Sequence, residues 1–81
     1  MLQTEVTYTT FYDQGVSLIA LYTSLLHQST TLEDKSFWQR HIRLTSAELE
    51  AVAPDDRHTQ STLYHRWQPL EEQLNQVRSM F

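Results

Sequence analysis

The stretch YTTFYDQGVSLIALYTSLL, residues 8–26, decides the fold. Its apolar side chains recur every three or four residues, which is the spacing of one face of an α-helix. Two such rows run side by side: Tyr8, Phe11, Gly15, Leu18, Tyr22 and Leu25 form the first, and Tyr12, Val16, Ile19 and Leu26 form the second. At about 100° per residue the two rows, with Leu21 at the margin, cover roughly 200° of the helix surface. One neighbouring helix cannot bury so wide a face, so the stretch predicts a helix with two helical neighbours.

Two further amphipathic segments supply those neighbours. The first follows a capping-box pattern at residues 30–33, which satisfies the free N–H groups at a helix start, and Pro54 ends it. Besides its main apolar stripe it carries a shorter one, Phe37 and Leu44. In the last segment a single apolar phase continues through Pro69, which favours one kinked helix over two separate ones. The main stripe of the segment before Pro54 is Trp38, Ile42, Thr45, Leu49 and Val52. The stripe of the last segment is Leu63, Trp67, Leu70, Leu74, Val77 and Phe81.

We therefore expect one all-α domain over residues 1–81, an up-down-up three-helix bundle with helices at about 8–27, 32–53 and 55–80. Thr10 and Asp13 indicate a capping-box-like start for the first helix, and Ser61 is an alternative start for the third. Gly15 inside the apolar face predicts a close approach of another helix. A core of this size leaves a thin stability margin and there is no cysteine for a disulfide, so we expect additional stability from a partner protein or from oligomerisation, and dimerisation is one way to complete the bundle.

Composition narrows the function. One lysine and five arginines stand against ten acidic residues, giving a net charge of −4, which is a poor balance for gripping a phosphate backbone. No run of about 18 apolar residues and no signal-peptide pattern is present, so we expect a cytoplasmic protein that does not enter a membrane. With one glycine there is no phosphate-binding loop. His58, His65 and Glu72 recur every seven residues, about 10 Å apart, too far to converge on a metal. We expect no catalytic residue, cofactor, metal or small-molecule substrate.

Several residues remain candidates for a binding site. Trp38 and Trp67 occupy stripe positions and are expected in the core, whereas Tyr12 and Tyr64 lie off the main stripes and are candidates to anchor a partner. A third candidate to contact a partner is Phe81, an apolar residue at the last position of the sequence. The candidate basic patch on the second helix consists of Lys35, Arg40 and Arg43. A possible buried polar site between the two stripes of that helix consists of His41 and Glu48.

The sequence is typical of a small non-enzymatic interaction protein, a regulator, adaptor or chaperone, that acts through an amphipathic helix surface. Another protein or a second copy of the chain is the expected partner, because the first helix has more apolar width than a small bundle covers. The alternative is a nucleic-acid accessory or regulatory factor that uses the basic patch on the second helix, although the net charge disfavours it.

Overall fold

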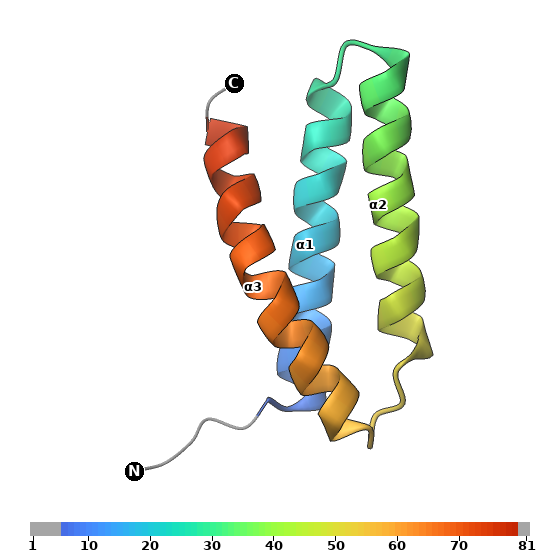
Figure 1. Ribbon diagram of the computed structural model, residues 1–81, viewed down its shortest axis with the longest axis vertical. Coiled ribbons are helices and arrows are strands. Elements are labelled where there is room, and N and C mark those ends of the chain that lie inside the picture. Colours follow the sequence, from blue (N-terminus) through green and yellow to red (C-terminus); the bar gives the residue numbers. More distant parts are fainter. Residues whose placement is uncertain (1–5, 80–81) are drawn as a thin grey trace.

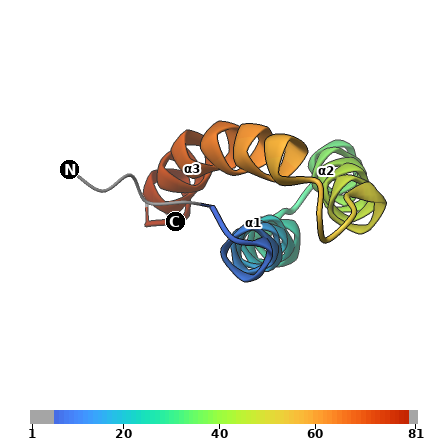
Figure 2. The same cartoon turned by 90° about the horizontal axis from the view of Figure 1, so that it is seen from below.

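The computed structural model describes residues 6–79, which form three helices in an up-down-up arrangement (Figure 1). The helices are α1 (Tyr8–Gln28), α2 (Leu32–Ala51) and α3 (Arg57–Ser79). α1 packs against both of the others, and seen from below it lies against the two outer helices on one side of them (Figure 2). The predicted bundle is confirmed, and the helix with the widest apolar face is the one that has two neighbours.

The helix ends follow local hydrogen bonding. The hydroxyl of Thr31 accepts a hydrogen bond from the Asp34 N–H at 3.1 Å, as the capping pattern predicted. The prediction that Thr10 caps α1 was wrong. Thr7 is the cap, and its hydroxyl accepts a hydrogen bond from the Thr10 N–H at 3.1 Å.

The other helix boundaries shift by one or two residues. α2 ends at Ala51 instead of residue 53, because Val52 turns to an extended conformation and buries its side chain in the core. α3 begins at Arg57 instead of residue 55, after Asp56 Oδ1 accepts a hydrogen bond from the Thr59 N–H at 3.2 Å. The predicted end of α3 at residue 80 lies outside the described residues.

All three helices meet at Gly15. A Cβ atom built on this glycine would lie 2.8 Å from Leu49 Cδ1 of α2 and 3.1 Å from Trp67 Cζ3 of α3. One turn earlier on α1, the buried ring of Phe11 stacks on Trp67 with 5.4 Å between ring centroids. The close approach predicted from this glycine is confirmed, because the missing side chain makes room for two large core residues.

α1 and α3 are also joined by polar contacts. The Ser17 hydroxyl donates a hydrogen bond to Glu71 Oε1 at 2.7 Å, and the Gln14 side-chain amide donates to the other oxygen of the same carboxylate. Both donors lie on α1 and the acceptor lies in the second half of α3, beyond Pro69. These contacts hold that half of α3 against α1.

α2 and α3 diverge from each other. α3 is one helix that bends along its length (Figure 1), and Pro69 at its middle is the identifiable cause, since proline removes a backbone donor and crowds the preceding turn. Within residues 6–79, no Cα atom of α2 lies within 8 Å of a Cα atom of α3. The bundle is therefore held together through α1, and the facing sides of the outer helices are not packed backbone against backbone.

The second apolar row of α1 is only partly covered. Ile19 and Leu26 are half-buried, but 43% of Tyr12 and 48% of Val16 remain exposed. The two neighbours thus bury most of the first row and only the margin of the second. They also bury Leu21, so the covered face of α1 is displaced away from Tyr12 and Val16.

Candidate functional site

The largest apolar feature left uncovered between the outer helices is a pair of strips, one on α2 and one on α3. The four side chains are apolar, and between about a third and just over a half of each is exposed. They are Phe37 at 48%, Leu44 at 54%, Leu70 at 36% and Val77 at 37%, and we call them the apolar seam. In each strip the two residues are seven positions apart and so lie on one side of their helix, two turns from each other.

An ion pair shows that the two strips face each other. Arg66 of α3 donates a hydrogen bond from its guanidinium to the Glu48 carboxylate of α2. Leu44 precedes Glu48 by four residues and Leu70 follows Arg66 by four, so each lies one turn from the pair on the same side of its helix. The seam therefore starts beside the ion pair and continues toward Phe37 as α2 and α3 diverge.

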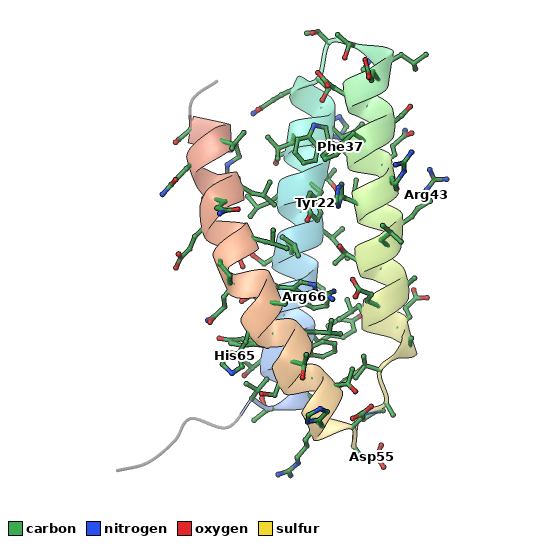
Figure 3. The ribbon with its side chains drawn as sticks, viewed as in Figure 1. Tyr22, Phe37, Arg43, Asp55, His65 and Arg66 are labelled. Carbon is green, nitrogen blue, oxygen red and sulfur yellow. The ribbon has the colours of Figure 1, made fainter. Side chains whose placement is uncertain are left out.

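Tyr22 of α1 is visible through the gap between α2 and α3 in Figure 3. Its ring is buried and stacks on His41 of α2 with 5.2 Å between centroids. Burial raises the pKa of the Tyr22 phenol above its ordinary value, and the negative charge of Glu48 acts in the same direction, opposed by Arg66. The floor of the seam is therefore aromatic and uncharged.

Aromatic rings surround His41. Besides Tyr22, two other rings lie close to the imidazole: the centroid of the Phe37 ring is 4.6 Å from that of His41, and the centroid of the Trp38 ring is 6.3 Å from it. The sequence placed His41 and Glu48 together as a candidate polar site between two stripes of α2. In the structure Glu48 forms an ion pair with Arg66, and His41 lies among aromatic rings. His41 instead belongs to the aromatic wall of α2, next to the seam.

Two pockets flank Phe37. One, of about 470 Å³, opens where α1 ends and α2 begins, and its walls include Phe37, Trp38 and Asp34. The other, of about 630 Å³, lies on the outer side of α2 and is lined by residues that include Glu33 and Arg40. Phe37 is thus a ridge between two hollows at the wide end of the seam.

The predicted anchor tyrosines lie outside the seam. Tyr12 is on α1 beside Tyr8, with 5.9 Å between ring centroids. Tyr64 is on α3, half-buried, and its hydroxyl accepts a hydrogen bond from Gln68 Nε2 at 2.9 Å. The structure does not bring the two together, and Phe81 lies outside the described residues.

The predicted basic patch is exposed but is not purely basic. Lys35, Arg40 and Arg43 all lie on the surface of α2, and Arg43 points away from the bundle (Figure 3). Arg40 shares its pocket with the acidic Glu33. In the part of the chain that the structure describes, no three His, Asp or Glu side chains are grouped to hold a metal ion.

Comparisons with protein-family models, curated proteins and solved structures give no match to this chain. Among the helices of residues 6–79, none combines the length and the apolar composition needed to cross a bilayer.

Proposed function

We propose that this protein binds an amphipathic helix of a partner protein along the apolar seam. The observation that carries the proposal is that large apolar side chains remain exposed on facing sides of α2 and α3. Exposed apolar side chains grouped on one face are characteristic of interaction sites in soluble proteins. The role is one of binding and not of catalysis, in the manner of small adaptors, regulators and chaperones.

The spacing of the seam suits a helix. Phe37 and Leu44 are seven residues apart, and so are Leu70 and Val77, which places the residues of each pair about 10 Å apart along their helix axis. An amphipathic helix laid in a groove uses apolar anchors at positions i, i+3 or i+4, and i+7, which cover the same length. The seam therefore matches two turns of a partner helix on both of its sides.

A partner helix fits these features better than a second copy of the chain. A stable interface between globular proteins uses about 20–30 residues on each side, whereas the seam offers four. Two copies with a net charge of −4 each also repel one another. A helix in a groove needs only a few well-buried anchors, because those anchors supply most of the binding energy.

A displayed library of amphipathic helical peptides tests the proposal. We expect the wild-type protein to enrich helices with an apolar i, i+4, i+7 pattern. Leu44→Glu and Val77→Glu, one on each side of the seam, should each weaken binding about tenfold or more, since a charge then replaces a buried anchor. Val16→Glu is the matched control, because the 48% exposure of Val16 lies between those of Leu44 and Val77 but the residue is on α1 outside the seam. Circular dichroism verifies that each variant is folded.

Failure to enrich any helix, or enriched helices that bind both seam variants as well as wild type, would contradict the proposal. Light scattering at micromolar concentration shows whether the protein is a dimer, in which a second copy of the chain could occupy the seam. A dimer that Leu44→Glu dissociates would assign the seam to a second copy. Binding to nucleic acid that falls steeply with salt and requires Arg40 would favour the basic surface of α2 instead.

A further inference from the structure

We infer that the pocket between the end of α1 and the start of α2 binds a cationic side chain, a lysine or an arginine. The occupant rests on the proposed function in one respect, because we assign this side chain to the helix that lies in the seam. Phe37, Trp38 and Asp34 line the pocket, and we call it the cation pocket.

Two aromatic rings form a corner of the cation pocket. The rings of Phe37 and Trp38 are almost perpendicular, at 85°, with 4.9 Å between their centroids. The tilted ring of Tyr22 lies 5.9 Å behind Trp38 and supports it from α1. The face of an aromatic ring carries partial negative charge and attracts an ammonium or guanidinium group, most strongly for tryptophan. The corner thus provides the chemistry that recognises a cation.

The charge of the cation pocket points to the same ligand. Asp34 precedes Trp38 by four residues and lies on the same side of α2. It carries the only formal charge among the residues that line the pocket, and the others are neutral. Within residues 6–79, no lysine, arginine or histidine is in ion-pair contact with Asp34. An unpaired carboxylate beside two rings favours a cation and disfavours an anion.

The helix ends at the cation pocket do not oppose a cation. The start of α2 carries partial positive charge, but Glu33 and Asp34 in its first turn offset it. α1 ends at the same place, and the last turn of a helix carries partial negative charge. The side chain of Leu25 on the pocket wall provides an apolar surface for the methylene stem of a lysine or arginine.

The cation pocket is continuous with the seam, because Phe37 belongs to both. A helix that places apolar anchors along the seam therefore brings its next turn to the cation pocket. The partner helix is then expected to carry a lysine or an arginine immediately beyond one end of its apolar stripe.

A titration that does not need the partner tests the cation pocket. N-acetyl-lysine amide is added to the labelled protein at neutral pH, and the indole N–H signal of Trp38 is followed by nuclear magnetic resonance. N-acetyl-norleucine amide, which lacks only the ammonium group, is the control ligand, and the buried Trp67 gives an internal reference signal. We expect a saturable shift of Trp38 with the lysine compound, weakened by salt, and no comparable shift with norleucine.

Two variants separate the pocket carboxylate from the general field of the protein. Asp34→Asn should weaken the lysine compound about two- to fivefold, the range for one exposed ion pair. Glu33→Gln removes the same charge from the adjacent residue, which lines the pocket on the other side of Phe37, and should weaken binding clearly less than Asp34→Asn. Equal shifts with norleucine, or equal losses in both variants, would overturn the inference.

The two proposals fail separately. Peptides that bind in a Leu44-dependent way but have no lysine or arginine preference and no response to Asp34→Asn would overturn the cation pocket and leave the seam intact. A specific lysine response of Trp38 without enrichment of any helix would support the cation pocket and contradict the proposed function.

Discussion

Replacing Gly15 with alanine sets two opposing effects against each other at the point where the three helices meet. Alanine is favoured over glycine inside a helix by about 1 kcal/mol. The new Cβ, however, would lie 2.8 Å from Leu49 Cδ1 and 3.1 Å from Trp67 Cζ3, and both neighbours are buried. Forcing an extra methyl group into a packed core costs about 1–3 kcal/mol. We expect Gly15→Ala to lower the free energy of unfolding by about 1 kcal/mol, a fall of about 4–8 °C in Tm.

Urea unfolding followed by circular dichroism measures this change, and two further variants isolate its parts. Ala20→Gly, at an exposed position of α1, measures the difference in helix propensity between alanine and glycine where no core packing changes. In a Leu49→Ala background the nearest crowding atoms are gone, so Gly15→Ala should become neutral or stabilising there. If Gly15→Ala stabilises the wild type by the full propensity term, or acts equally in both backgrounds, the reasoning from this contact is refuted.

Three other substitutions give shorter tests. Gln60 is fully buried, and its amide nitrogen donates hydrogen bonds to the carbonyl oxygens of Ala53 at 2.8 Å and Pro54 at 3.1 Å. Gln60→Ala should therefore lower the free energy of unfolding in urea by about 1–3 kcal/mol. No change would mean that these hydrogen bonds do not stabilise the loop. Because the pKa of Tyr22 is raised in the folded state, its contribution is complete below the unfolded pKa of about 10 and is lost as pH rises through the folded value. The urea midpoint of Tyr22→Phe should therefore fall less than that of wild type across this alkaline range, and parallel losses would contradict the assignment. Glu48→Gln breaks an exposed ion pair and should lower the free energy of unfolding by less than about 1 kcal/mol. A larger loss in urea unfolding would contradict the treatment of this pair as solvent-screened.

Much of the fold could be predicted from the sequence, because its signals are local. The double apolar row of residues 8–26 required two neighbours, and the uninterrupted phase through Pro69 required one helix. The start of α1 near residue 8 was predicted correctly, but its cap was assigned to Thr10, because Thr7 and Thr10 both suit a cap and only the backbone geometry selects Thr7. Side-chain periodicity shows which face of a helix must be covered by a neighbour. It does not give the distance of the helix that covers it.

That difference explains why the site was harder to predict. The second stripe of α2, Phe37 and Leu44, was visible in the sequence, but nothing in the spacing says that α3 leaves it exposed. The partner of Glu48 is Arg66, on another helix, and the spacing of residues along α2 cannot reveal such a contact. The corner formed by Phe37 and Trp38 depends on side-chain rotamers, which the sequence does not specify.

The absence of backbone packing between α2 and α3 within residues 6–79 has a mechanical consequence. Each outer helix packs against α1. Beyond the loop that joins them, where Gln60 is hydrogen-bonded to Ala53 and Pro54, α2 and α3 share one solvent-screened ion pair among the described residues, Glu48 with Arg66. We therefore expect a bound helix to set the separation of α2 and α3 at the end of the seam farthest from that loop.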